Sequence, residues 1–548
     1  MLSPYLLQSY ITQSQADITL KISKTSHHSI DNILLACGFV SAEQVAQVKA
    51  QRLKTEYVDL KKFTPQEEAL KLIPRDKAIE YSVLPLMIQN SQLIVAIDER
   101  ADYKHLSFLQ RASKLEIRFV ISCRDEIIKH LMTHSYFTQD DATLLKINAL
   151  KEKKGANIIA LVDLLIEDAI EDSASDIHIS PEKNVINVFY RVDGVLLHYH
   201  TLPKEFQKQI VSRIKHMSNL DISQTSLPQD GELEYTYLYN SFRLRVSSIN
   251  TSFGENIVMR VLKNDASSLS LDSLGLSTRD RKILTKLFSQ PNGLILVTGP
   301  TGSGKTTTLY SSLKEIDSLA KNVLTVEDPI EYQIPFIKQT QINTKAGYTF
   351  QTALRAFMRQ DPDVILVGEI RDEETASLAL RASITGHLVL STLHTNDAVS
   401  SISRLSDLKI PEYLIGSATI GIIAQRLVRK LCPHCKTPVK DTQKLLQKFK
   451  VPNRIIQEVS TITIFEAQGC EKCFDTGYAS REIIIEILQI DKTIEDMIVK
   501  SKSSLEILEY AYSKGMRSML NDGFLKVLKG SSSFEEIERM VLDREFIK

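Results

Sequence analysis

The sequence predicts a multidomain α/β protein whose largest domain is a doubly wound, mostly parallel sheet. Three observations indicate this fold class. The chain has 548 residues, which is too long for a single hydrophobic core. Four short apolar, β-branched runs alternate with helical patterns in its second half. The first of these runs leads into Gly299–Thr306, which fills every fixed position of the pattern G-x-x-x-x-G-K-[ST].

This glycine-rich segment has the composition of a phosphate cradle. Gly299, Gly302 and Gly304 lack the Cβ atoms that would obstruct inward-pointing N–H groups, and the following helix adds its positive N-terminal end. Lys305 supplies a charge for the β- and γ-phosphates of ATP, and the Thr306 hydroxyl is a ligand for Mg²⁺. The other positions expected to contact the nucleotide are Pro300, Thr301, Ser303 and Thr307. A structural turn with an incidental lysine is the alternative, but the buried strand before it and the helix after it favour a nucleotide site.

Bulk composition sets limits on the protein's class. Lys+Arg and Asp+Glu both total 67, so net charge gives no argument for nucleic acid or for a membrane surface. The first positive charge is Lys21, so the N-terminus lacks the basic segment of a secretory signal. No apolar run reaches the roughly 18 residues that a membrane helix needs. We therefore expect a cytosolic protein.

Residues 1–145 form a predicted N-terminal α/β module without a catalytic cluster. Residues 30–51 indicate two short helices, residues 81–97 two strands around a Q-N-S-Q turn, and residues 125–134 a helix. The polar segment K-E-K-K-G at 151–155 predicts a linker to the next module.

A second module is predicted at residues 156–265. We expect an α+β domain, PAS-like in type as the family resemblance described below implies, which begins with an amphipathic helix and continues into strands. Arg191 lies at a strand-to-turn segment and Arg213 on a helix, and each alone is typical of a solvated surface charge. Because the module precedes the phosphate site, either arginine could instead reach the nucleotide of a neighbouring subunit. Both interpretations stay open.

Polar side chains follow the later strands of the nucleotide domain, which is predicted at 273–548. Ligands of such sheets lie off the carboxyl ends of the strands, where the chain places Glu327, Glu369 and His394. An acid after an apolar strand, as in V-I-L-V-G-E, suits Mg²⁺ and its waters beside a triphosphate. Both glutamates are candidates for the general base. The predicted strands are 294–298, 323–326, 364–367 and 388–392.

Four of the six cysteines form two C-x-x-C pairs near the C-terminus, Cys432, Cys435, Cys470 and Cys473. Four thiolates satisfy a tetrahedral Zn²⁺ and leave no open position, so we predict a structural zinc in a subdomain at 426–490. A redox pair is the alternative. Residues 491–548 indicate amphipathic helices that serve packing.

The motifs together resemble those of the type II/type IV secretion ATPase superfamily. The segments G-P-T-G-S-G-K-T-T-T-L, V-E-D-P-I-E-Y, V-G-E-I-R-D-E-E-T and T-G-H-L-V-L-S-T-L-H-T-N look like its Walker A, Asp, Walker B and His boxes. Similarity extends to A-S-D-I-H-I, R-V-D-G-V-L, L-P-Q-D-G and A-Q-R-L-V-R-K-L-C-P-H-C, and covers roughly residues 158–490. The resemblance implies a RecA-like P-loop NTPase domain in a Mg²⁺-dependent ATPase that acts as a homohexamer.

The resemblance also implies roles for single residues. Glu327 would polarise the attacking water, Glu369 would hold Mg²⁺ through water, and His394 would contact the γ-phosphate. Arg371 could form a structural ion pair with Asp372 or stabilise charge at the site. The candidate charge stabilisers are Arg355, Arg359 and Arg371. The Cys₄ site is typical of the assembly and secretion branches of the family.

In that family, hydrolysis would push an inner-membrane platform protein and assemble pilins or pseudopilins, while residues 1–145 dock on a membrane-associated partner. Thr225 and Ser226 depart from the family, which commonly has basic residues there. The R-L-G-x-x-L motif with which some assembly ATPases bind a cyclic dinucleotide is missing, so that ligand is not predicted. One rival is a nucleic-acid-translocating motor, which the neutral charge and the absence of Trp disfavour. The other is a nucleotide-binding scaffold without turnover.

Overall fold

The computed structural model divides the chain into two compact units, Met1–Ser267 and Ser268–Lys548. The linker predicted at 151–155 and the module boundaries predicted at 145, 156 and 265 lie outside the described residues. No helix within the described ranges is long and apolar enough to cross a membrane. The structure describes residues 2–25, 29–73, 77–78, 81–98, 109–110, 113–132, 158–238, 240–263 and 269–541.

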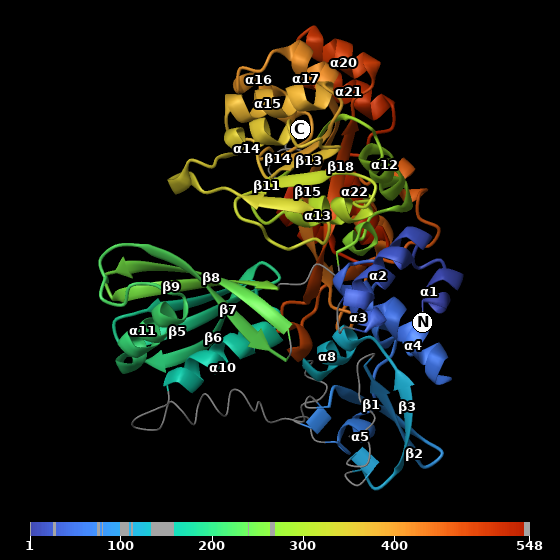
Figure 1. Cartoon of the computed structure of the whole chain (residues 1–548), viewed down its shortest axis with the longest axis vertical. Helices are drawn as coiled ribbons and strands as arrows, with labels where there is room; N and C mark the ends of the chain where they lie inside the picture. The colour runs from blue at the N-terminus through green and yellow to red at the C-terminus, as the bar shows by residue number, and fades with distance from the viewer. Residues whose placement is uncertain are drawn as a thin grey trace. The chain divides into compact units, whose positions relative to one another are not determined.

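Short helices and a three-stranded sheet form the N-terminal part of the first unit (Figure 1). The two helices predicted within 30–51 are present, and Ser41 caps the second by accepting a hydrogen bond of 3.2 Å from the Gln44 N–H. Strands β1 and β2 pair antiparallel around the predicted turn, and β3 adds parallel to β2. The elements are α1 (Ser3–Leu7), α2 (Gln13–Thr25), α3 (Ile30–Ala36), α4 (Ala42–Leu53), α5 (Glu67–Leu70), β1 (Val83–Gln89), β2 (Gln92–Ile97), β3 (Glu116–Ile121) and α8 (Arg124–Met132).

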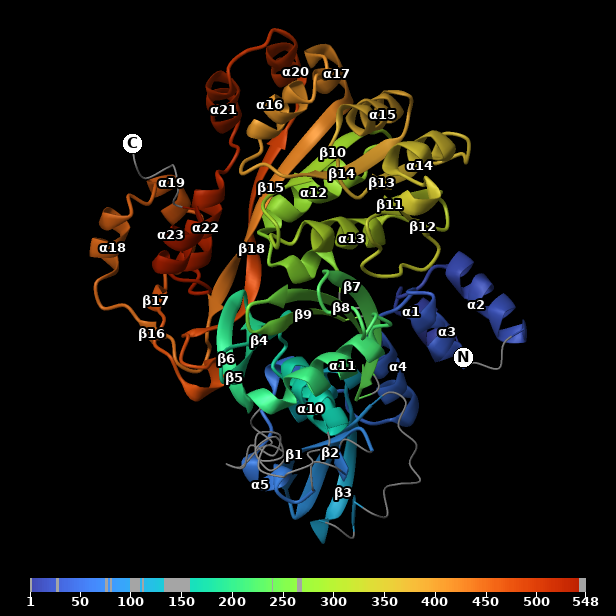
Figure 2. The ribbon, with the colours of Figure 1, turned by 90° about the vertical axis from the view of Figure 1, so that its left-hand side faces the viewer.

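Two helices on an antiparallel sheet form the second part of this unit (Figure 2). The strand order is β6-β5-β4-β9-β8-β7. Helices α10 and α11 cover one face, where alternate strand residues such as Ile177 and Leu244 are fully buried against them. The elements are α10 (Ile158–Glu171), β4 (Asp176–Pro181), β5 (Val185–Val192), β6 (Val195–Pro203), α11 (Gln207–Met217), β7 (Gln229–Tyr237), β8 (Asn240–Thr251) and β9 (Gly254–Lys263).

Charged residues stand side by side in one row across the opposite face of this sheet. The register pairs Asp176 with both Arg191 and Arg260, Arg260 with Arg245, and Arg245 with Glu232. Asp176 lies 3.0 Å from Arg260 Nε and 3.6 Å from Arg191 Nε, and Glu232 lies 3.6 Å from Arg245 Nε. The two acids therefore offset the repulsion between the adjacent arginines. Part of the row lines a groove of about 500 Å³.

The second unit is built on a seven-stranded sheet of order β12-β11-β13-β14-β10-β15-β18 (Figure 1). Neighbours pair in parallel, except that β18 is antiparallel to β15. The four predicted strands correspond to β10, β11, β13 and β14, whereas β12, β15 and β18 were not predicted. The strands are β10 (Gly293–Thr298), β11 (Val323–Glu327), β12 (Lys338–Gln341), β13 (Val364–Val367), β14 (Leu388–Leu393), β15 (Thr419–Leu431) and β18 (Tyr478–Gln489).

Helices cover both faces of this sheet, which confirms the predicted doubly wound α/β class. Helices α14, α15 and α17 pack on the face to which Leu294 and Leu296 contribute. Helices α12 and α13 lie on the other face (Figures 1 and 2). The helices are α12 (Thr278–Phe288), α13 (Lys305–Glu315), α14 (Phe350–Phe357), α15 (Glu373–Ile384), α16 (Ser400–Asp407) and α17 (Glu412–Ala418).

A long antiparallel ribbon of β15 and β18 carries a cysteine-rich lobe at one end. Leu431, the last residue of β15, directly precedes Cys432, and β18 begins at Tyr478, soon after Cys473. The predicted C-terminal helices follow, and Ser533 caps the last of them by accepting a hydrogen bond from the backbone N–H of Glu536. The elements are β16 (Thr437–Pro438), α18 (Thr442–Lys448), α19 (Asn453–Ile456), β17 (Phe465–Glu466), α20 (Lys492–Val499), α21 (Ser504–Ser513), α22 (Met519–Leu528) and α23 (Phe534–Val541).

A buried charge cluster ties these helices to the start of the unit. The Arg517 side chain is 5% exposed and lies 2.8 Å from Asp280 on α12, 3.3 Å from Asp522 on α22 and 2.5 Å from Glu458. Burial raises the pKa of Asp522 to about 6, against the opposing charges of Lys526 and Arg517. One guanidinium group therefore compensates two buried carboxylates on distant elements.

Candidate nucleotide site

The glycine-rich segment joins β10 to α13 at the carboxyl edge of the sheet and forms a compact turn. A Cβ atom on Gly299 would lie 2.4 Å from the carbonyl oxygen of Gln425, and Gly304 adopts φ of 87° at the start of α13. The Ser303 hydroxyl is buried and has no hydrogen-bond partner among the described residues. A phosphate oxygen would satisfy this hydroxyl and the N–H groups of the turn, so the cradle fits the phosphates of a nucleotide.

Two side chains at the start of α13 complete the cradle. Lys305 Nζ reaches back across the turn and donates to the carbonyl oxygens of Gly299, at 2.8 Å, and Pro300, at 3.0 Å. Burial lowers the pKa of Lys305, and the negative charge of Glu369 opposes that shift. Thr306 is exposed, so its hydroxyl is accessible to a metal ion.

Gln425 supports the cradle from β15, and the sequence analysis did not identify it. Its amide nitrogen donates to the carbonyl oxygen of Ser303 at 2.8 Å, and its amide oxygen accepts a hydrogen bond of 2.8 Å from the Thr308 hydroxyl. The side chain is fully buried. The only signal in the sequence is one polar residue inside the apolar run I-G-I-I-A-Q.

Glu369, Arg371 and His394 gather beside Lys305. The Glu369 carboxylate lies 2.6 Å from Arg371 Nη2 and 3.7 Å from His394 Nε2. Arg371 thus pairs with Glu369, while Asp372 caps α15 instead. Burial, followed by the charge on Lys305, lowers the pKa of His394, so its imidazole is neutral at physiological pH. This group combines a metal-binding carboxylate with a neutral hydrogen-bonding ring.

Glu327 ends β11 at the same edge but lies farther from the cradle. Strand β11 is three strands from β10, which corresponds to about 14 Å. The carboxylate accepts from the Tyr310 hydroxyl on Oε2, and from Thr325 Oγ1 at 2.5 Å and Gln339 Nε2 at 3.3 Å on Oε1. Burial raises the pKa of Glu327, and these three hydrogen bonds oppose the shift. Glu369 and His394 therefore share a contact, whereas Glu327 is linked to α13 through Tyr310.

The remaining candidate arginines lie elsewhere. Arg355 pairs with Glu374 at 2.6 Å on the surface, and Arg359 donates to the Arg355 carbonyl oxygen at 2.9 Å. Arg213 on α11 lies 3.6 Å from Asp163 on α10, which places it on the helix-covered side of the first unit's sheet. Arg191 belongs to the charged row on the opposite face. The structure thus places Arg191 and Arg213 on different faces of one sheet.

The four cysteines of the two C-x-x-C pairs come together, with all four sulfur atoms within 4.8 Å of one another. Three of the sulfur–sulfur distances are 3.7 to 3.9 Å, which matches the edge of about 3.8 Å expected for a sulfur tetrahedron around zinc. Backbone N–H groups of Gly469 and Gly477 donate to Cys435 and Cys473 at 3.4 and 3.3 Å. Such donors stabilise thiolates, so the cluster fits a tetrahedral metal ion.

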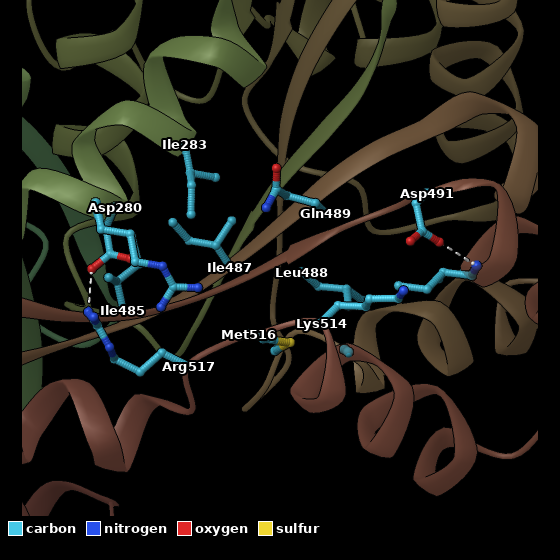
Figure 3. Close-up of a pocket in the computed structure, with 13 residues that line it drawn as sticks. Asp280, Ile283, Ile485, Ile487, Leu488, Gln489, Asp491, Lys514, Met516 and Arg517 are labelled. Carbon is cyan, nitrogen blue, oxygen red and sulfur yellow. Dashed lines mark hydrogen bonds and ion pairs between the residues drawn. The ribbon is translucent and has the colours of Figure 1, made fainter. Parts of the chain in front are cut away.

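A separate cavity of about 210 Å³ lies between α12, the end of β18 and the C-terminal helices (Figure 3). Charged side chains surround an apolar floor that includes Ile283 and Ile487, and the Arg517–Asp280 pair closes one side. None of the nucleotide-site residues described above lines it.

The fold and this edge of the sheet define a P-loop nucleotide-binding protein. The sequence model described as "Type II/IV secretion system protein" matches residues 151–539, and one described as "MshEN domain" matches residues 53–140. The chain therefore belongs to the type II/IV secretion system family, and it is an ATPase of that family.

Individual relatives agree with this assignment. The type IV pilus assembly ATPase PilB of Thermus thermophilus is 38% identical over 93% of this chain, which spans 58% of the length of that relative. The type II secretion system protein HxcR of Pseudomonas aeruginosa is 43% identical over 72% of this chain and 79% of its own. The X-ray structure of the Legionella pneumophila ATPase DotB is similar in fold, with a TM-score of 0.53 and 21% identity over 72% of this chain and 98% of its own.

Proposed function

We propose that this chain hydrolyses ATP with Mg²⁺, as a homohexamer at the cytoplasmic face of the inner membrane, to power type IV pilus assembly. The juxtaposition of the cradle with Glu369, Arg371 and His394 carries the proposal. Two relatives named as PilB, from Thermus thermophilus and Myxococcus xanthus, align over 93% of this chain, whereas HxcR aligns over 72%. The longer alignment with the two PilB relatives favours pilus assembly over secretion as the function. Type II secretion is the second candidate, because HxcR has the higher identity, 43%.

The site residues divide the work of phosphoryl transfer. Lys305 would neutralise the β- and γ-phosphates, while Thr306 and, through water, Glu369 would hold Mg²⁺, which offsets the charge of the triphosphate. Glu327 would polarise the attacking water. The neutral His394 would hydrogen-bond the γ-phosphate, and Arg371 would stabilise charge. Arg355 and Arg359 would stabilise charge as well, although their described contacts are with Glu374 on α15 and with the Arg355 carbonyl oxygen on α14.

A second copy of the chain would supply further cations. The charged row presents Arg191 on the sheet face opposite the helices, next to Asp176 of the groove, whereas Arg213 lies in the helix layer. One neighbouring site cannot receive both faces of a sheet, so Arg191 is the stronger arginine-finger candidate.

The function predicts a specific set of activities. The purified chain should hydrolyse ATP with Mg²⁺ and should show no stimulation by single-stranded DNA; strong stimulation would favour a nucleic-acid motor.

Arg191→Ala should lower the rate of ATP hydrolysis by about 10³-fold, in the range of an arginine finger, while Arg213→Ala should leave it near wild type. Co-expressed Arg191→Ala and Lys305→Ala chains, purified as mixed oligomers through two tags, should regain activity. An inactive mixture would argue against sites shared between subunits.

The cysteine cluster should hold one structural zinc ion. Elemental analysis of freshly purified, unchelated protein should find about one zinc per chain, because four thiolates complete a tetrahedral site. Cys473→Ser should lose the metal and lower the melting temperature, while the matched Cys37→Ser variant should retain both. Protein without zinc would remove the metal from this proposal.

Residues 1–145 would dock on a membrane-associated partner, and the motor would act on an inner-membrane platform protein. Crosslinking of the full-length chain in cells should recover membrane proteins through this N-terminal region, and crosslinks confined to other regions would contradict the docking role.

A further inference from the structure

We propose that Tyr310 is a positioning residue that fixes the carboxylate of Glu327 and links it to the nucleotide-binding helix. This inference rests on the proposed function, in which Glu327 polarises the attacking water. Tyr310 was not identified from the sequence. It lies four residues after Thr306 on α13, so the two side chains share one face of that helix, about one turn apart.

Most of the described contacts of Tyr310 are with the segment that carries the base. Its side chain is 1% exposed, and its hydroxyl donates to Oε2 of Glu327. The hydroxyl oxygen of Tyr310 accepts hydrogen bonds from the backbone N–H of Glu331 at 3.2 Å and from Gln339 Nε2 at 3.4 Å. Its ring packs edge-on against Tyr332, with centroids 5.6 Å apart. The segment from 327 to 332 therefore wraps around one side chain of α13.

This arrangement restrains the base at both of its oxygens. Thr325 and Gln339 donate to Oε1, and Tyr310 donates to Oε2. Burial, and then the neighbouring carboxylate, raises the pKa of Tyr310, so its hydroxyl keeps the proton that it donates. Tyr310 is thus the member of this set that belongs to the helix beginning at Lys305. Any shift of α13 on nucleotide binding reaches the Glu327 carboxylate through one hydrogen bond.

Positioning of this kind affects the chemical step rather than nucleotide binding. Tyr310 is not part of the cradle, and the P-loop backbone and Lys305 are left in place by its substitution. A carboxylate without the Oε2 donor samples more orientations, and small misplacement of a catalytic group costs about 10- to 100-fold in rate. The hydroxyl also favours the ionised carboxylate, so its loss makes Glu327 easier to protonate. The negative charge of Glu331, which also raises the pKa of Glu327, is unchanged by the substitution.

The test uses Tyr310→Phe in the full-length chain, with Tyr348→Phe as the matched control. Tyr348 lies in the same domain and donates to Thr340 Oγ1 at 3.1 Å rather than to an acid. Tyr310→Phe should lower kcat by about 10- to 100-fold with KM for ATP unchanged. Its acidic limb in the pH profile of kcat should move to higher pH. Tyr348→Phe should behave as wild type, and Thr325→Val, which removes another donor, should reproduce the effect of Tyr310→Phe.

A double-mutant cycle with Glu327→Gln distinguishes a positioning role of Tyr310 from a general loss of activity. If Tyr310 acts through Glu327, adding Tyr310→Phe to Glu327→Gln should cause no further loss of kcat. An unchanged kcat and pH profile in Tyr310→Phe, with Glu327→Gln inactive, overturns the inference and leaves the proposed function intact. A fully active Glu327→Gln variant overturns the assignment of Glu327 itself, and with it this role of Tyr310.

Discussion

Replacement of Glu327 by glutamine should lower kcat for ATP hydrolysis by about 10³-fold while nucleotide binding is retained. The amide keeps the size of the side chain and cannot accept a proton from water. Its oxygen can still accept from Thr325 and Gln339, and the Tyr310 hydroxyl can rotate to accept from its NH₂ group, so the fold should be preserved. Steady-state hydrolysis and binding of a fluorescent nucleotide measure the two effects separately.

The pH dependence of the wild-type enzyme provides a second measurement of the same group. Burial raises the pKa of Glu327, and a base works only when ionised, so kcat should fall as pH drops through that raised value. The Glu327→Gln variant should lose this limb. Glu315→Gln, at the far end of α13, is the matched control and should leave kcat near wild type. Wild-type turnover in Glu327→Gln would contradict the role of Glu327 as the base, whereas an inactive wild-type oligomer that still binds ATP would support a nucleotide-binding scaffold.

Replacement of Arg517 by methionine should destabilise the second unit by about 3–5 kcal/mol, because it leaves buried carboxylates without their counter-charge. Asp280 and Asp522 have side chains only 7% and 3% exposed, and both depend on this guanidinium. Thermal unfolding of the full-length chain, followed by circular dichroism, should show a melting temperature lower by roughly 10 °C. Arg355→Met, which breaks an exposed ion pair, should change stability by less than about 1 kcal/mol.

The pH dependence of the stability deficit shows whether Arg517→Met destabilises the protein through the lost charge or through lost packing. Asp522 has a folded-state pKa of about 6, raised from 3.8, so its proton contributes stability at low pH that is lost as pH rises through 6. Arg517 opposes this shift, and its removal should raise the pKa of Asp522 further. The deficit of Arg517→Met should therefore be larger at about pH 8 than at about pH 5. A deficit that does not vary with pH would indicate lost packing alone.

The parallel core of the nucleotide domain could be predicted because each of its strands carries its own local signal. β10, β11, β13 and β14 are short, buried on both faces and followed by polar residues. β12 has the polar sequence K-Q-T-Q and is only an edge strand, so it has no hydrophobic pattern. β15 follows α17 without a turn residue, and its two-sided burial removes the alternation that marks a strand. The domain boundaries stay predictions.

The residues of the candidate site were likewise predictable only where their signal is local in the sequence. The cradle is contiguous in sequence, so spacing alone identified Gly299, Lys305 and Thr306. Gln425 and Tyr310 act through contacts that only the fold creates, since each meets its partner from a distant element. The pairing of Arg371 with Glu369 likewise depends on side-chain direction, which the sequence left open. The catalytic roles of Arg355 and Arg359 remain predictions.

The ribbon of β15 and β18 makes the cysteine lobe and the phosphate turn mechanically continuous. Gln425 supports the phosphate turn through its hydrogen bond to Ser303. Cys432 lies seven residues later in the chain, about 23 Å away for an extended strand. A paired strand resists stretching along its axis far better than a loop does. A displacement of the lobe is therefore transmitted along β15 to Gln425, which holds the carbonyl oxygen of Ser303. The four-cysteine cluster therefore restrains the free end of this ribbon, and we expect its disruption to change the affinity for nucleotide.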